Sequence, residues 1–174
     1  MPKNLSYGVA IFPSKDVQDE ANSYRMRYDP NYSRIPPHIT LKERFEASQS
    51  EINEIANELS KIAKEMEPFD IEIKKVSSFS PATNTVYLKV EPNDNLTHLN
   101  DRMHEGNLPD DRQFSFVPHI TISQALSDDE HSDVFGSLKM VTFDMKDTID
   151  RFQLLYQLED GTWTVYETFK FGKG

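Results

Sequence analysis

Two stretches of this 174-residue sequence share a tetrapeptide, and they decide which fold to expect. Residues 33–43 read SRIPPHITLKE and residues 114–124 read FSFVPHITISQ, so Pro-His-Ile-Thr occurs around His38 and again around His119. Both copies alternate polar and apolar residues, which is typical of a half-buried strand. Because side chains alternate between the two faces of a strand, each copy presents a histidine and a threonine together, His38 with Thr40 and His119 with Thr121.

The opposite face of each predicted strand is aliphatic. We expect Ile39 and Leu41 in one copy, and Ile120 and Ile122 in the other, to lie in the core. The next residues on the two presenting faces are Lys42 and Ser123, which are further candidates for contacting a ligand there. A lysine at such a position is, however, more often a solvated strand residue.

The predicted elements around the two copies follow a similar order. In the first half, Ser48 and Glu51 have the spacing of a capping box at the start of a helix, and in the second half Ser127 and Glu130 repeat it. The sequence predicts helices at 14–28, 49–66, 94–105 and 128–138, and strands at 5–12, 38–45, 69–79, 85–92, 114–123, 140–147, 151–158 and 162–171. Asp160-Gly161 is a strong hairpin signal between the last two strands. We therefore predict an α+β protein forming a single domain over residues 1–174, with pseudo-repeats at roughly 1–92 and 93–174 that form two similar lobes packed together.

The composition narrows the classes of partner. Acidic residues number 29 against 19 basic ones, for a net charge of −10, which argues against binding long duplex nucleic acid but permits a small cleft for a short nucleotide. The chain contains no cysteine, so disulfides and thiolate metal sites are excluded. The apolar N-terminal run is too short for a secretion signal, and no run approaches a membrane span, so we expect a cytoplasmic protein with no membrane partner.

Two histidines facing one another across a cleft suit acid–base chemistry on a phosphodiester. One neutral imidazole can take a proton from the nucleophile while the other, protonated, gives one to the leaving oxygen. The threonine hydroxyls can donate hydrogen bonds to the non-bridging phosphate oxygens. This scheme requires neither a metal nor a cofactor, and no cluster with metal-ligand spacing is apparent. The alternative is that both histidines are incidental strand residues.

Other residues that could carry chemistry have simpler explanations. Three histidines outside the motifs are expected on the solvated surface: His98, His104 and His131. Four strand aromatics could stack on a nucleobase, although core packing is the expected role for most of them: Tyr87, Tyr156, Trp163 and Tyr166.

The two His-x-Thr motifs, one in each half of a small duplicated chain, resemble those of the two-histidine (2H) phosphoesterase superfamily, which includes the LigT-like RNA ligases and 2′,3′-cyclic phosphodiesterases. The whole chain resembles the YjcG branch of that superfamily, known from Gram-positive bacteria. Its likeness is carried by ANSYRMRYDPNYSRIPPHIT (21–40), LSDDEHSDVFG (126–136) and RFQLLYQLEDGTWTVYETF (151–169).

The resemblance implies a bilobal fold with antiparallel sheets lining a central cleft and helices outside. It also implies that His38 and His119 are the catalytic pair and that Thr40 and Thr121 bind phosphate. The implied activity is hydrolysis of a cyclic or 2′-linked phosphodiester of a nucleotide or RNA end. A nucleotide- or RNA-end-binding module without turnover, and an RNA end-joining ligase, are the alternatives. LigT-like members often place an arginine shortly after the second motif, where this chain continues ITISQAL (120–126), so Lys42 could supply the charge from the other lobe.

Overall fold

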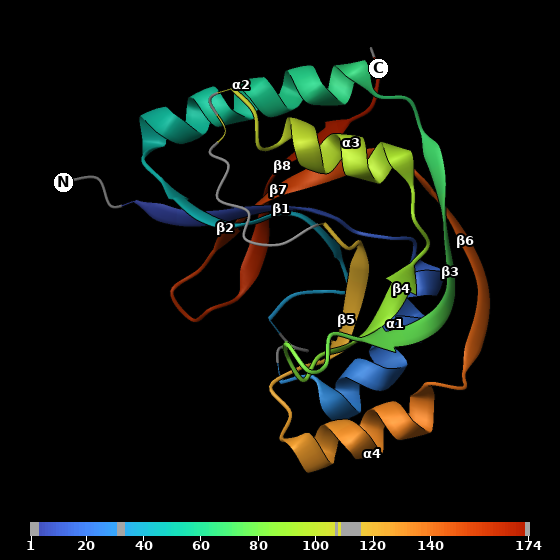
Figure 1. Cartoon of the computed structure of the whole chain (residues 1–174). Helices are drawn as coiled ribbons and strands as arrows, with labels where there is room; N and C mark the ends of the chain where they lie inside the picture. The colour runs from blue at the N-terminus through green and yellow to red at the C-terminus, as the bar shows by residue number, and fades with distance from the viewer. Residues whose placement is uncertain (1–3, 31–33, 107, 109–115, 173–174) are drawn as a thin grey trace.

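The computed structural model describes residues 4–30, 34–106, 108 and 116–172, and this part of the chain is α+β, as predicted (Figure 1). Its elements follow one another in the order β1 (Leu5–Ile11), α1 (Lys15–Tyr28), β2 (Ile39–Ala47), α2 (Gln49–Glu65), β3 (Phe69–Ser78), β4 (Val86–Val90), α3 (Asp94–Arg102), β5 (His119–Ser123), α4 (Asp128–Leu138), β6 (Thr142–Ile149), β7 (Arg151–Gln157) and β8 (Trp163–Lys170).

The strands form two four-stranded sheets in which all neighbours are antiparallel. Sheet A has the order β2-β1-β7-β8, and sheet B has the order β5-β4-β3-β6. The two strands that carry the repeated motifs, β2 and β5, are therefore edge strands, and each has its single neighbour on one side. These two edges contact one another where the sheets meet, which brings the repeated motifs together.

The helices cover the outer faces of the sheets. Two of them, α1 and α3, each connect strands of one sheet but pack against the other. Helix α1 joins two strands of sheet A, yet it packs against β5 of sheet B. Helix α3 joins two strands of sheet B and packs against β2 of sheet A. Figure 1 shows the result, with α2 and α3 on one side of the molecule and α1 and α4 on the other. Within the described ranges, no helix has the length and apolar character needed to cross a membrane.

The two lobes are not the two halves of the sequence. Each sheet combines two strands from residues 1–92 with two from residues 93–174, because the chain crosses from sheet A to sheet B after α2 and returns between β6 and β7. The expectation that each half forms its own lobe is thus corrected, since pairing between distant strands cannot be read from local periodicity. The pseudo-repeat of the sequence itself stays a prediction.

Local signals in the sequence locate the helix starts well. Ser48 and Glu51 form the predicted capping box of α2, and Ser127 and Glu130 form that of α4, with the serine hydroxyl and the glutamate side chain each accepting from the other residue's backbone N–H. The strand predicted at 114–123 begins only at His119 in the structure, and its first residues, 114 and 115, lie outside the described ranges. Pro118 lacks an N–H to donate to a neighbouring strand, which is consistent with the later start.

Candidate active site

The two motifs use the alternation of a strand as predicted. Ile39 and Ile120 are completely buried, and Leu41 and Ile122 are buried with them in the core. Thr40 pairs across the sheet with Ala10 of β1, and Thr121 pairs with Tyr87 of β4. The edge positions of β2 and β5 then leave His38, Thr40, His119 and Thr121 half-buried around one cavity.

The cavity has a volume of about 280 Å³ and draws its walls from both sheets and from α1. Both predicted pairs, His38 with Thr40 and His119 with Thr121, line it. The other lining residues are Gly8, Val9, Ala10, Arg25, Asp29, Ile35, Lys42, Glu43, Arg44, Gln124, Leu155 and Trp163. Three of these are cationic and two are acidic, so this cavity offers more positive charge than the strongly acidic chain as a whole.

The two histidines are held by the same backbone contact. Nδ1 of His38 lies 2.8 Å from the carbonyl oxygen of Pro36, and Nδ1 of His119 lies 2.7 Å from that of Val117. A carbonyl oxygen only accepts hydrogen bonds, so Nδ1 carries the proton in both rings. Each neutral imidazole therefore keeps the lone pair on Nε2, the nitrogen on the far side of the ring from this backbone contact.

Aromatic rings pack differently around the two histidines. The ring of Phe12 lies edge-on to His38, with centroids 6.4 Å apart. His119 contacts two rings at shorter range, Phe79 at 4.9 Å and Tyr87 at 5.2 Å between centroids. These contacts shield part of each half-buried imidazole from water.

The environment of the pair disfavours protonation. Burial is the largest cause that lowers the pKa of His38 to about 4, and the positive charges of Arg25 and His119 act in the same direction. The hydrogen bond to Pro36 and the charge of Asp29 act in the opposite direction on that pKa. Burial also lowers the pKa of His119, against the hydrogen bond to Val117. Near neutral pH both rings are therefore mainly neutral, and each Nε2 can accept a proton.

A comparison with known families identifies the superfamily of the chain. Residues 13–161 match the family described as the 2′-5′ RNA ligase superfamily. The chain belongs to this superfamily. A relative named "Putative phosphoesterase" from Oceanobacillus iheyensis is 57% identical over 97% of this chain and 99% of its own length. The chain itself is thus a phosphoesterase-type member of the superfamily, as the resemblance of its two motifs implies.

Solved structures of E. coli LigT have the same fold. LigT complexed with 3′-AMP has a TM-score of 0.75 at 15% identity, covering 97% of this chain and 99% of LigT. LigT complexed with NADP+ has a TM-score of 0.71 at 16% identity, covering 98% of this chain and 100% of LigT. The antiparallel bilobal architecture expected of the superfamily is thereby confirmed for this chain.

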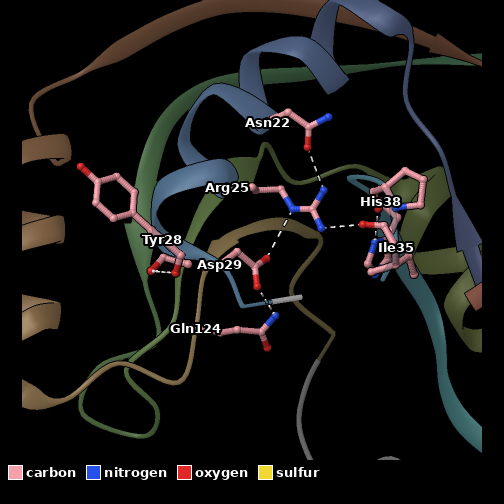
Figure 2. A network of polar contacts seen from close by, with 9 residues as sticks. Asn22, Arg25, Tyr28, Asp29, Ile35, His38 and Gln124 are labelled. Carbon is pink, nitrogen blue, oxygen red and sulfur yellow. Dashed lines mark hydrogen bonds and ion pairs between the residues drawn. The ribbon is translucent and has the colours of Figure 1, made fainter. Parts of the chain in front are cut away.

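An arginine lies in the cavity although none follows the second motif, where LigT-like members of the superfamily often have one. Arg25 comes from α1, and Figure 2 shows its guanidinium between Asp29 and the carbonyl of Ile35. Gln124, the residue directly after β5, donates to Asp29 from the other side. Sequence reasoning missed this cluster because Arg25 and Asp29 have the spacing of an ordinary surface pair. The available signal was that Arg25 continues the apolar stripe of Val17 and Ala21.

The two additional candidates from the motif strands have different outcomes. Lys42 lines the cavity and is only 2% exposed, so the solvated alternative is wrong. The pairing of β1 with β2 shifts register between Tyr7 and Val9, and Lys42 pairs with Val9 at this irregularity. Ser123 is completely buried and does not line the cavity, because its hydroxyl donates to the Tyr28 carbonyl at the end of α1.

Two of the three histidines expected on the surface are buried. His98 is exposed, as predicted. His104 is 6% exposed, with Nδ1 2.6 Å from the Asn100 carbonyl oxygen, and His131 is 8% exposed, with Nε2 2.6 Å from the Ser78 hydroxyl. His131 also stacks on Phe135. The prediction failed because these hydrogen bonds compensate the imidazole polarity.

Among the strand aromatics, Trp163 reaches the cavity. It begins β8, lies on the same face of sheet A as Leu155, and lines the cavity with it. Tyr87 is 5% exposed and packs on Phe79, so its role combines core packing with contact to His119. Tyr156 and Tyr166 pack edge-to-face on each other and do not line the cavity.

Proposed function

We propose that this protein is a metal-independent phosphoesterase that hydrolyses a cyclic or 2′-linked phosphodiester of a nucleotide or RNA end. The observation that carries the proposal is the pair of imidazoles around one cavity, each with Nδ1 bound to a backbone carbonyl and Nε2 left for proton transfer. Membership in a superfamily of phosphoester-processing proteins supports the same chemistry.

The proposed reaction uses the two imidazoles in opposite protonation states. One neutral Nε2 removes a proton from water as the water oxygen bonds to phosphorus. The protonated Nε2 of the other ring gives its proton to the leaving ribose oxygen as the bond from that oxygen to phosphorus breaks. Thr40 and Thr121 donate hydrogen bonds to the non-bridging oxygens, where negative charge accumulates. Each proton-transfer partner contributes a factor of ~10²–10⁴ to the rate.

The surroundings of the two rings favour His38 as the base and His119 as the acid. Burial lowers the pKa of His38 to about 4, and the positive charge of Arg25 beside this ring adds to the effect. Burial is the leading influence on His119, and an anionic phosphate entering the cavity favours the imidazolium form. The productive state is thus a singly protonated pair that forms with the bound substrate, and the two sites titrate together.

The shape of the cavity supports a nucleotide as the substrate. Trp163 and Leu155 give it an apolar wall on sheet A, where Gly8 and Ala10 add little side-chain volume. An indole ring can stack on a nucleobase while the phosphoester lies against the histidines. Related E. coli LigT has been solved with 3′-AMP and with NADP+, which is consistent with a nucleotide pocket in the shared fold.

The deciding experiment is turnover of 2′,3′-cyclic nucleotides followed by phosphorus NMR in the presence of a chelator. We expect conversion to a nucleoside monophosphate at an undiminished rate, whereas the protein with both His38 and His119 replaced by alanine should be inactive. Strict dependence on an added divalent cation would contradict the acid–base scheme and favour metal-assisted hydrolysis. Binding of the cyclic nucleotide without turnover would instead favour a nucleotide-binding module.

An RNA end-joining activity is the second candidate, favoured by the superfamily that the chain matches. In joining, the 5′-hydroxyl of a second RNA end replaces water as the nucleophile that attacks the cyclic phosphate. The same two imidazoles would serve, one taking the proton of this hydroxyl and the other protonating the leaving ribose oxygen. Incubation with RNA ends carrying a cyclic phosphate and a 5′-hydroxyl distinguishes the two. Hydrolysis leaves a monophosphate end, whereas ligation gives a longer product with a new 2′-5′ linkage.

A further inference from the structure

Helix α1 carries a buried ion pair whose placement is not explained by stability alone. The side chains of Arg25 and Asp29 are each 2% exposed, and Nε lies 3.4 Å from Oδ2. The same helix carries Lys15 and Asp19 at the same spacing, but with side chains 86% and 60% exposed. Removing two charges from water is costly, and a buried pair is often no more stabilising than apolar residues of similar size. A role in positioning neighbouring segments would account for the burial of this pair.

The pair connects α1 to two other segments. Arg25 donates from Nη1 to the Asn22 side chain at 2.9 Å and from Nη2 to the Ile35 carbonyl oxygen at 2.5 Å. Asp29 accepts a hydrogen bond from Nε2 of Gln124 at 3.1 Å. Figure 2 shows the resulting chain of contacts, which runs from the Ile35 carbonyl through the guanidinium and the carboxylate to the amide of Gln124.

Each end of this chain lies beside one of the two motifs. Ile35 precedes Pro36, whose carbonyl accepts from Nδ1 of His38. Gln124 directly follows β5, the strand that begins with His119. Because β2 belongs to sheet A and β5 to sheet B, the ion pair is a polar connection between the lobes at the level of the catalytic histidines.

We propose that Arg25 and Asp29 are positioning residues that fix the segment carrying His38 relative to strand β5, and so set the separation of the two imidazoles. This inference rests on the proposed function. Proton transfer at both ends of a phosphodiester needs both Nε2 atoms in reach of one phosphate, and a displacement of about 1 Å can cost ~10² in rate.

The test removes both charges at once, by Arg25→Met together with Asp29→Asn, so that no lone charge is left buried. The matched control is Lys15→Met together with Asp19→Asn, the same replacements at the same spacing on the exposed part of α1. We expect the first double variant to lose ~10–100-fold in kcat with KM changed less than about threefold, because the phosphate still binds but the imidazoles are misplaced. The control should keep the wild-type kcat.

A second readout reports on His38 without using activity. In the wild type, imidazole nitrogen chemical shifts should give Nδ1–H as the tautomer of neutral His38 and of His119. Without the contact to Ile35, the adjacent Pro36 carbonyl can move, and His38 should gain the Nε2–H tautomer. His119, held by Val117, serves as the internal reference. A folded double variant in which only one of kcat and the His38 tautomer changes, or neither does, overturns the proposal.

Arg25→Lys decides the matter if the double variant does not fold. It keeps the charge opposite Asp29, but one ammonium group cannot reach Asn22, Asp29 and the Ile35 carbonyl as the planar guanidinium does. The same two changes are expected, and wild-type behaviour in both readouts overturns the proposal. If the wild type turns over no phosphodiester, the proposed function fails separately, and the nitrogen shifts alone decide the positioning role.

Discussion

The two histidines have identical neighbours in sequence and different neighbours in space. Both donate from Nδ1 to the carbonyl two residues earlier. Beside His38 lies the buried Arg25–Asp29 pair, whereas His119 packs against the rings of Phe79 and Tyr87. A repeated tetrapeptide thus gives two histidines the same backbone contact, and residues outside the repeat give them different surroundings. Burial lowers the pKa of both rings, and at His38 the positive charge of Arg25 adds to this effect.

The largest expected effect is on kcat, and it tests whether the two histidines contribute equally. His38→Ala and His119→Ala should each lower kcat on a 2′,3′-cyclic nucleotide by ~10²–10⁴-fold, because each removes one proton-transfer partner. The double variant should lose little more than either single one, since the pair acts as a unit. His98→Ala, on the exposed face of α3, is the control and should keep the wild-type rate. A single histidine variant with wild-type turnover would falsify the two-histidine mechanism.

The lowered pKa of His38 should make the free energy of unfolding depend on pH. The pKa of His38 is about 4 in the folded protein, against about 6.5 in an unfolded chain, so the unfolded chain binds the proton more readily. Stability due to this group is present above pH 6.5 and is lost as pH falls toward 4, by up to about 3 kcal/mol.

Urea unfolding of the wild type and of His38→Gln between pH 7.5 and 4 measures this loss. The variant should lose less stability than the wild type over that range. His119→Gln should flatten the dependence as well, because burial also lowers the pKa of His119. Parallel curves for the wild type and His38→Gln would mean that the His38 pKa is close to its ordinary value.

Replacing either threonine should have a smaller effect on turnover, because each change removes one hydrogen bond to the same phosphate. Thr40→Ala and Thr121→Ala should each lower kcat/KM about 10-fold, the equivalent of one hydrogen bond to a charged oxygen. Serine at either position keeps the hydroxyl and should restore most of the activity. If alanine at one position has no effect while the other is sensitive, then only one lobe binds the non-bridging oxygens.

The smallest effect concerns the rings beside His119. Phe79→Leu should admit water to this imidazole and raise its pKa toward the ordinary value, leaving the pKa of His38 unchanged. Phe12→Leu is the matched change beside His38, where the ring is farther away, and should shift the His38 pKa less. Proton NMR titration of the two imidazoles measures both. An equal shift of both pKa values in Phe79→Leu would contradict local desolvation as the cause.

Features governed by nearby residues could be predicted from the sequence. The capping boxes at Ser48 and Ser127 depend on contacts within one helical turn, and the burial of Ile39 and Ile120 depends on strand alternation. The cavity positions of His38 and His119 followed from the same alternation once the motif had been seen twice.

Features that depend on distant partners could not be predicted. Arg25 and Asp29 have the same spacing as the exposed pair Lys15 and Asp19, and what distinguishes them is packing against β5 and the Ile35 segment. His131 is buried because its Nε2 is hydrogen-bonded to the hydroxyl of Ser78, which lies in a strand from the other half of the sequence. Strand pairing across the halves likewise depends on residues too far apart for periodicity to report.

The exchange of α1 and α3 between the sheets has a mechanical consequence. Each helix is tied covalently to one lobe and packed on the other, and side-chain contacts reinforce both crossings, from Ser123 to Tyr28 and from Asn100 to Leu41. A hinge motion that widened the cleft would have to separate both helices from the sheets they cover. We therefore expect the lobes to move as one rigid body, with a catalytic aperture of fixed width that selects substrates by size before any chemistry begins.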